Sequence, residues 1–108
     1  MRVLVPLAQD CEEIEAVTVI NLLRRAGIEV VSAGLDAKPV KASRGVMLIP
    51  DTDLDSALRS EYDMVVLPGG AGTKHLAADE RILTLVRSMA ESGRHVAAIC
   101  AAPTVLAK

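Results

Sequence analysis

Cys100 stands at a position from which a thiol can act as a nucleophile. The apolar run HVAAIC ends at this residue, and the small residues AAP follow it. A strand that ends in a sharp turn before a helix displays its last side chain at the carboxyl end of a sheet, and the helix N-terminus favours a thiolate there. The same pattern also fits a small buried hydrophobic residue that finishes a strand, which is a common environment for free cysteine. The local pattern therefore leaves a nucleophilic role and a packing role open.

Two neighbouring glycines, Gly69 and Gly70, follow the apolar run VVLP. Because glycine lets the backbone approach a ligand closely, their N–H groups can face the negative charge that develops on a reacting carbonyl oxygen. An ordinary glycine turn explains the same residues. By itself the pattern favours the turn, and its occurrence together with Cys100 points to an oxyanion site.

Three glutamates, Glu12, Glu13 and Glu15, occupy the start of a predicted helix. Acidic side chains are stabilised at a helix N-terminus by the helix dipole, and this effect accounts for Glu12 and Glu13. Glu15 falls instead within the register of the apolar side of the helix. A carboxyl directed inward keeps its proton more readily than one in water and can donate it to a thiolate. We therefore expect Glu15 to be the acid of the site.

These residues are positioned by alternating strand and helix patterns. The strand-like runs are apolar throughout, as in buried parallel strands, and the segments between them repeat apolar residues at helical spacing. The predicted strands cover residues 3–5, 28–34, 63–70 and 95–100, the predicted helices cover 12–26, 53–58 and 79–92, and a small hairpin or a pair of edge strands is expected within 35–52. Because parallel crossovers are right-handed, the pattern predicts a three-layer α/β sandwich with a mainly parallel sheet, in a single domain of residues 1–108.

The C-terminal residues AAPTVLAK begin a helix that reaches Lys108 without a cap or a stop signal. A helix this short is marginal alone. We therefore expect this chain to be the N-terminal portion of a domain truncated after the turn at Cys100. It is expected to associate with a companion C-terminal segment of the same protein, or to form a dimer that covers the gap.

The composition argues against several classes of protein. The 108 residues are 51% hydrophobic but 1% aromatic, 24% are charged, and the formal net charge is -2. Disorder is therefore not expected, nor is a nucleic-acid surface, which needs basic and aromatic side chains. No run approaches the roughly 20 apolar residues that cross a membrane, and the two cysteines form neither a disulfide framework nor a metal-binding pattern. We expect a cytoplasmic protein without a metal or another cofactor.

The motifs EEIEAV, VVLPGG and AAICAAP resemble, in this order and spacing, those of the DJ-1/ThiJ/PfpI family. The opening RVLVPLA and the segments LLRRAGIEVVSAGLDAKPVKASRGV and IPDTDLDSA are similar to its DJ-1 branch, so the resemblance covers the whole chain. It implies a flavodoxin-like sandwich and a homodimer. Members of the family continue for roughly another half-length, which agrees with a truncated domain.

The resemblance also implies roles for individual residues. Cys100 corresponds to the reactive cysteine of the family. Glu15 corresponds to the protonated glutamate that hydrogen-bonds to the cysteine sulfur and to its oxidised sulfinate form. Gly69 and Gly70 match the glycines beside the cysteine, and the N–H groups of Gly70 and Ala101 are the implied oxyanion donors.

One further residue matches the pattern of the family, and several others differ from it. Arg44 matches an arginine of the dimer surface whose surroundings help to frame the pocket. Ala101 stands where protease-like members have a histidine directly after the nucleophile, which weakens assignment as a peptidase. His75 and His95 do not replace the histidine found near the cysteine in the DJ-1 branch, because His75 falls in a loop or a short helix and His95 begins a strand at its far end. We interpret both as surface or structural residues. Cys11 stands where the family usually has a small residue. It has either a packing role, which the pattern favours, or a second redox role.

The resemblance implies a cysteine-dependent enzyme that acts on small reactive carbonyl compounds. Such enzymes are of the glutathione-independent glyoxalase or protein deglycase type and protect against oxidative stress. The Cys100 thiolate would attack an aldehyde, and Glu15 would move a proton between adjacent carbons. The alternative is a redox-sensing stress chaperone that uses the same cysteine, because a carboxyl beside a sulfinate suits this oxidation state. A glutamine amidotransferase shares the strand-to-helix turn but needs a downstream histidine–glutamate pair and has no use for Glu15, so it ranks below both.

Overall fold

The main sheet is parallel, with β1 at its centre. In the computed structural model, which describes residues 1–100 and 102–106, five strands of these residues form a sheet in the order β5-β2-β1-β6-β7. All neighbouring strands in it run parallel. The strands are β1 (Arg2–Leu7), β2 (Glu29–Gly34), β5 (Thr52–Asp53), β6 (Met64–Leu67) and β7 (His95–Ala98). The parallel sheet predicted from the apolar runs is confirmed.

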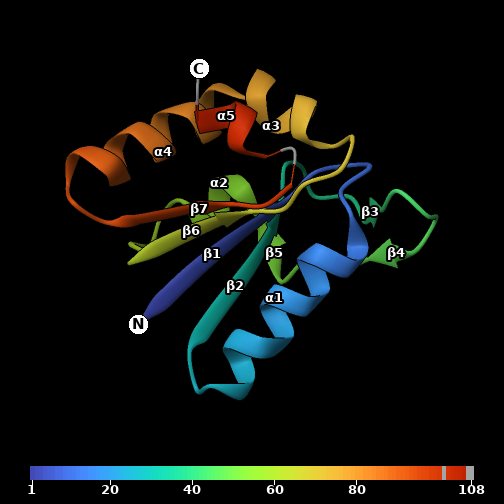
Figure 1. Ribbon diagram of the computed structural model, residues 1–108, viewed down its shortest axis with the longest axis horizontal. Coiled ribbons are helices and arrows are strands. Elements are labelled where there is room, and N and C mark those ends of the chain that lie inside the picture. The colour runs from blue at the N-terminus through green and yellow to red at the C-terminus, as the bar shows by residue number, and fades with distance from the viewer. Residues whose placement is uncertain (101, 107–108) are drawn as a thin grey trace.

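Helices cover both faces of this sheet (Figure 1). Helix α1 (Glu13–Arg25) packs on one face, and the remaining helices pack on the other. The helices of the second face are α2 (Leu54–Ala57), α3 (Thr73–Ala78), α4 (Glu80–Glu91) and α5 (Pro103–Leu106). The predicted three-layer α/β sandwich is therefore confirmed.

Strand β1 contributes to two hydrophobic cores, one on each face of the sheet. Val3 and Val5 belong to the core under α1, whereas Leu4 belongs to the core under α2 to α5. Successive side chains of a strand point to opposite faces, which explains this division. All three side chains are fully buried, so the central strand forms a rigid support for the segments that follow the strands.

A separate hairpin lies between β2 and β5. Strand β3 (Val40–Lys41) pairs in antiparallel orientation with β4 (Met47–Leu48), which confirms the hairpin expected within residues 35–52. The sequence does not predict β5, because its two residues contain no apolar run, yet they extend the sheet beside β2. It also leaves α3 open between a loop and a short helix.

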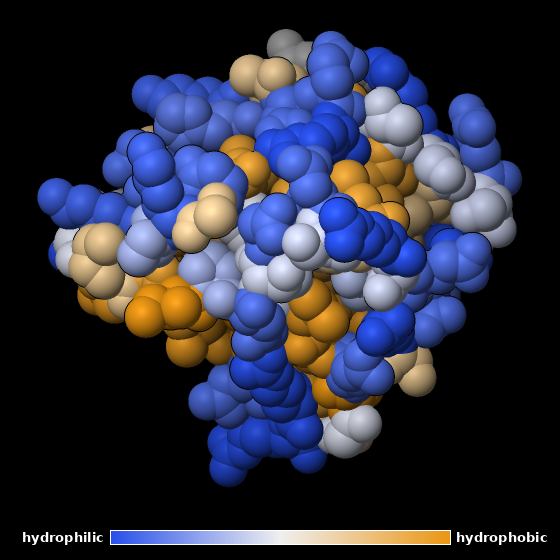
Figure 2. Space-filling model, turned by 180° about the vertical axis from the view of Figure 1, so that it is seen from behind, coloured by the Kyte–Doolittle hydropathy of each residue, from blue (hydrophilic) through white to orange (hydrophobic). Residues whose placement is uncertain are grey.

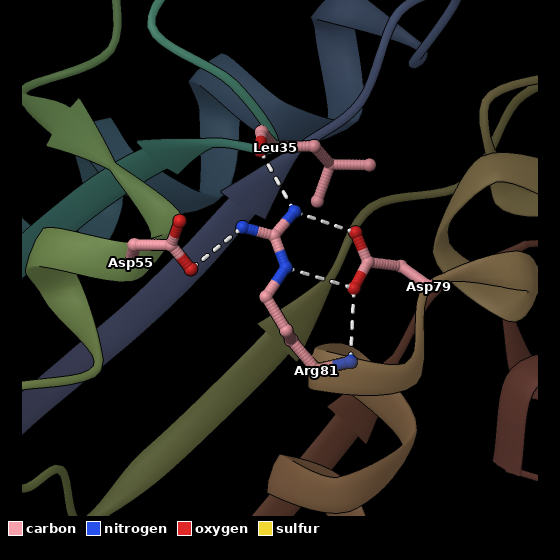
Figure 3. Close-up of polar contacts among 4 residues, drawn as sticks. All are labelled: Leu35, Asp55, Asp79 and Arg81. Atoms are coloured by element: carbon pink, nitrogen blue, oxygen red, sulfur yellow. Dashed lines mark hydrogen bonds and ion pairs between the residues drawn. The ribbon is translucent and has the colours of Figure 1, made fainter.

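Arg81 connects segments that follow different strands (Figure 3). Its Nε and Nη2 atoms donate to the two carboxylate oxygens of Asp79 at 3.1 and 2.7 Å. The guanidinium also donates to Asp55 at 2.9 Å and to the carbonyl of Leu35 at 2.8 Å. These hydrogen bonds hold the pKa of Asp79 below its usual range. We call these four residues the Arg81 clasp, which ties the end of β2 to α2 and to the start of α4.

Hydrophobic side chains interrupt the hydrophilic surface in patches on the face seen in Figure 2. Large apolar residues with high exposure include Ile49 at 86% and Ile14 at 73%. Within residues 1–100 and 102–106, none of the helices has the length and apolar character needed to cross a membrane.

Candidate active site

The candidate site lies where the order of the strands reverses. The chain passes from β1 outward to β2 and β5, and then returns to β6 and β7 on the other side of β1. Ligands of open parallel sheets bind at the carboxyl ends of the strands beside such a switch point. The segments that follow β1, β6 and β7 meet there, and they carry Glu15, Gly69 and Cys100.

Cys100 forms a sharp turn after β7. Its φ of 56° is a left-handed conformation that few residues other than glycine adopt, and such strain is common at functional sites. The residue before it is held to the neighbouring strand, because Ile99 N donates to Leu67 O at 3.1 Å. Cys100 is an exposed residue. The turn therefore leaves it accessible to solvent, as an elbow that carries a nucleophile must do. Ala101, the predicted oxyanion donor after it, lies outside the described residues.

Gly69 is the point of contact between Glu15 and Cys100. The Gly69 N–H donates to Glu15 Oε1 at 2.9 Å. A Cβ atom placed on Gly69 would lie 2.6 Å from Glu15 Oε1 and 2.8 Å from Cys100 Cβ. Both side chains therefore pack against the bare Cα of this glycine, and a larger residue would separate or displace them. Glu15 as a residue is half-buried.

Close packing against the chain before α1 explains why residue 70 is a glycine. Its φ is 92°, and a Cβ atom there would lie 2.6 Å from Glu12 N. Cys11 forms an antiparallel bridge with Gly70, so the chain before α1 runs directly against the glycine loop. The close approach explains the residue type without a ligand, and the role of Gly70 as an oxyanion donor stays a prediction.

Glu13 is a buried residue that the sequence pattern did not single out. It is 9% exposed, and its Oε1 atom accepts a hydrogen bond from Ser43 Oγ at 2.9 Å. Helix-dipole complementarity does not require burial. The signal that could have identified Glu13 is its spacing, because it precedes Ala16 by three positions and Ile20 by seven on the side of α1 that faces the core.

Arg44 lies in the turn that contacts Glu13. Its backbone N donates to Glu13 Oε2 at 3.0 Å and to Oε1 at 3.3 Å. The residue itself is exposed. The backbone of Arg44 is thus connected to the start of α1. The role of the Arg44 side chain at the rim of a pocket stays a prediction.

The two cysteines have opposite environments. Cys11 is 2% exposed, and burial, assisted by the nearby Glu13 carboxylate, raises the pKa of its thiol to about 11. Cys100 is exposed. A thiol that is buried and protonated is inert, so Cys100 is the cysteine that external reagents can reach.

Among residues 1–100 and 102–106, the histidines and the acidic residues form no further catalytic or metal-binding centre. His95 begins β7 and therefore lies at the opposite end of this strand from Cys100. His75 lies on α3 and lines a small cavity with Gln9 and Asp36. In the same part of the chain, no group of three His, Cys, Asp or Glu side chains could hold a metal ion.

Known proteins resemble this chain over nearly its whole length. The model of the DJ-1/PfpI family matches residues 1–108. Protein dj-1beta of Drosophila melanogaster is 47% identical over 97% of this chain and 57% of its own length. Glutathione-independent glyoxalase DJR-1.2 of Caenorhabditis elegans is 38% identical over 91% of this chain and 53% of its own length. The crystal structure of Drosophila melanogaster DJ-1beta matches with a TM-score of 0.95 at 45% identity, covering 98% of this chain and 58% of that one.

The chain therefore spans little more than half the length of these relatives. The match in fold to DJ-1beta confirms the flavodoxin-like sandwich that the motifs implied. Since the family match also extends over every residue, the chain belongs to the DJ-1/PfpI family.

Proposed function

We propose that the protein is a cysteine-dependent enzyme that converts small reactive carbonyl compounds and thereby protects against oxidative stress. The activity is of the glutathione-independent glyoxalase or protein deglycase type. One observation carries the proposal: the Glu15 carboxyl and the Cys100 side chain pack against the same glycine, Gly69. A nucleophile with an acid beside it suits a carbonyl substrate. The relative from Caenorhabditis elegans that is named a glyoxalase supports this substrate class.

For methylglyoxal, the proposed reaction oxidises the aldehyde carbon by two electrons and reduces the neighbouring carbonyl carbon by the same two electrons. The Cys100 sulfur bonds to the aldehyde carbon, and the aldehyde oxygen takes up a proton to give a hemithioacetal. Glu15 moves the hydrogen of this carbon, as a proton, to the adjacent carbonyl carbon. The oxygen of that adjacent carbon gains one proton, and the hydroxyl of the hemithioacetal loses one. The first carbon becomes a thioester and the second an alcohol. Water then hydrolyses the thioester, which releases lactate and returns the thiolate.

The negative charge that forms on the aldehyde oxygen needs hydrogen-bond donors. The proposed donors are the N–H groups of Gly70 and Ala101, because backbone amides at the carboxyl edge of the sheet can be fixed in place before the reaction. We assign Arg44 to the rim of the substrate pocket.

The replacement Cys100→Ala tests the enzymatic proposal. We expect the consumption of methylglyoxal by the intact protein, without glutathione, to fall by about a thousandfold or more, because no other group can form the covalent intermediate. Cys11→Ala is the matched control, since it removes the buried thiol, and it should retain turnover. The proposal is wrong if the wild-type protein consumes no methylglyoxal, or if the Cys100→Ala variant matches it.

The second candidate function is a redox-sensing stress chaperone, which the contrast between exposed Cys100 and buried Cys11 favours. Hydrogen peroxide would transfer one oxygen to the Cys100 thiolate and release water, and a second peroxide would give the sulfinate. Intact-mass measurement after peroxide treatment should then show a stable gain of two oxygen atoms in wild-type protein and none in Cys100→Ala. An exposed free thiol of this kind also fits the reducing cytoplasm that we propose as its location.

We further propose that the protein is a homodimer and that a C-terminal companion segment of the same protein covers the β7 side of the sheet. Exposed apolar residues of α1 and of the segment after β4 support the dimer, above all Ile14, Val17 and Ile49. Val17 and Ile49 line one cavity, so the two exposed regions adjoin. Strand β7 contains no buried residue, since His95 is exposed and the other three are partly buried, whereas all residues of β1 after Arg2 are buried. This contrast supports the companion segment.

A further inference from the structure

Glu13 is a largely buried residue with a carboxylate that the proposed reaction does not use. It accepts hydrogen bonds from Ser43 Oγ at 2.9 Å and from Arg44 N at 3.0 and 3.3 Å. The ion pairs formed between described side chains do not include it. Burying an ionised group is costly unless hydrogen bonds compensate for the lost water. The backbone N–H of Glu13 itself and the donors from one turn together explain how the carboxylate is tolerated. The contact with the turn raises the question of what the carboxylate holds in place.

The turn that binds Glu13 is also joined to the residue that precedes α1. Ser43 N donates to Cys11 O at 2.9 Å, and the turn is closed by a hydrogen bond of 3.0 Å from Gly45 N to Ala42 O. The turn thus holds the start of α1 at two positions, the carbonyl of Cys11 and the carboxylate of Glu13.

The glycine loop holds the start of α1 from another direction. Glu12 N donates to Gly69 O at 3.0 Å, and Cys11 pairs with Gly70. Glu15 belongs to the first turn of the same helix, and its Oε1 atom accepts from Gly69 N at 2.9 Å. A shift at the start of α1 would therefore move the Glu15 carboxyl relative to Gly69.

We propose that Glu13 is a positioning residue, whose carboxylate holds the first turn of α1 in the place where Glu15 can act on Cys100. The inference rests on the proposed role of Glu15 as the acid of the site. It also gives the turn around Arg44 a function that depends on its backbone N–H, which is one of the donors to Glu13.

The amide signal of Gly69 reports the relevant contact, because this N–H donates to Glu15. In nuclear magnetic resonance spectra of the intact protein, Glu15→Ala should move the Gly69 amide proton upfield by removing its acceptor. We expect Glu13→Ala to move it in the same direction. Glu13→Gln keeps a side-chain oxygen for the turn and should restore the wild-type position. An unchanged Gly69 signal in Glu13→Ala would overturn the proposal.

The rate of Cys100 alkylation by iodoacetamide at neutral pH is the second readout. Glu15→Ala should slow it by about threefold to tenfold, because the replacement removes the hydrogen-bond donor that we propose for the reacting sulfur. Glu13→Ala should slow it in the same range. The double variant should be no slower than Glu15→Ala alone, because one residue acts through the other. If the two replacements slowed alkylation independently, so that their factors multiplied in the double variant, Glu13 would not act through Glu15.

Two further variants separate positioning from general stability. Ser43→Ala removes one donor to Glu13 without changing a charge, and it should give a smaller change of the same kind in both readouts. Asp51→Asn is the matched control, because Asp51 accepts from Ser32 N at 2.9 Å and from Arg24 at 2.8 Å near the other end of α1. It should lower the melting temperature without changing either readout. If Asp51→Asn changed the Gly69 signal and the alkylation rate as much as Glu13→Ala does, the effect of Glu13 would be one of general stability and not of positioning.

These readouts do not depend on turnover of methylglyoxal. If Glu15→Ala leaves the alkylation of Cys100 unchanged, the proposed role of Glu15 fails and the role of Glu13 fails with it. If Glu15→Ala slows alkylation and Glu13→Ala does not, the positioning role alone is wrong.

Discussion

Gly69 lies against the two side chains of the proposed chemistry, Glu15 and Cys100, and its missing Cβ leaves room for both. In Gly69→Ala the added methyl group would collide with Glu15 Oε1 and with Cys100 Cβ. We expect turnover of methylglyoxal to fall by about a hundredfold, because small displacements of reacting groups are costly, and unfolding to become easier by about 1–3 kcal/mol. Kinetics and urea denaturation measure the two effects.

Gly93→Ala is a suitable control for this replacement. Gly93 has a φ of 77°, but a Cβ atom there would meet nothing within 4 Å. The control should therefore lose about 1–2 kcal/mol of stability through backbone strain and retain turnover. If Gly69→Ala kept full activity, the close packing of Glu15 and Cys100 against Gly69 would not matter for the reaction.

Cys11 should make the protein sensitive to alkaline pH. Burial raises the pKa of its thiol to about 11, above the value of about 8.5 expected in the unfolded chain. The stability contributed by the neutral thiol is thus complete below about pH 8.5 and is lost as the pH rises toward 11. The loss amounts to about 2 kcal/mol near pH 10. Urea denaturation at neutral and alkaline pH should show it in wild-type protein and in Cys100→Ala, and a Cys11→Ala variant that loses as much would refute it.

Local residue patterns were enough to suggest Cys100, Gly69 and Glu15, because each follows a strongly apolar strand or opens a helix. They were not enough to identify Glu13. Its partners, Ser43 and the backbone of Arg44, lie 30 and 31 residues away in the sequence. A side chain whose donors come from a distant turn carries no local signal beyond its position on the apolar side of α1.

Secondary-structure elements with long apolar repeats were predictable, and the shortest ones were not. The unbroken run before Gly69 gave β6, and the repeat after Asp79 gave α4, whose N-cap side chain accepts from Arg81 N at 2.9 Å. Strand β5 has two residues and owes its pairing to the edge of β2. The N-cap of α3 is Gly72, whose lack of a side chain gives the sequence no capping signal.

The Arg81 clasp should contribute stability that depends on acid pH. Arg81 lowers the pKa of Asp79, so the contribution is present above about pH 3.9, the value for an unfolded aspartate, and is lost as the pH falls through the lower folded value. We expect Arg81→Ala to lower the free energy of unfolding by about 1–2 kcal/mol at neutral pH. The difference from wild type should shrink toward about pH 3.

Urea denaturation across this pH range measures both effects. Arg87→Ala replaces an exposed arginine of the same helix and should change the stability little. A constant difference between wild type and Arg81→Ala at all pH values would show that the clasp does not act through the Asp79 carboxylate.

For the whole molecule, the exposed apolar surface predicts self-association. Ile49 is 86% exposed and lines a cavity of about 220 Å³ together with Val17 of α1. We expect Ile49→Asp to convert a dimer of the intact protein into a monomer, because a buried, unpaired carboxylate opposes association. Sedimentation measures the mass, and Thr84→Asp, an exposed change on α4, is the control that should stay dimeric. A wild-type protein that sediments as a monomer would contradict the dimer.

The Arg81 clasp also bears on the lifetime of the native state. Two of its partners, Leu35 and Asp55, adjoin Arg81 only after the segments that carry them have assembled. Interactions of this kind are weak in a transition state that forms early, so their loss speeds unfolding and leaves the folding rate nearly unchanged. The persistence of the folded form that displays the Cys100 thiol therefore depends in part on a guanidinium group on the opposite face of the sheet from α1.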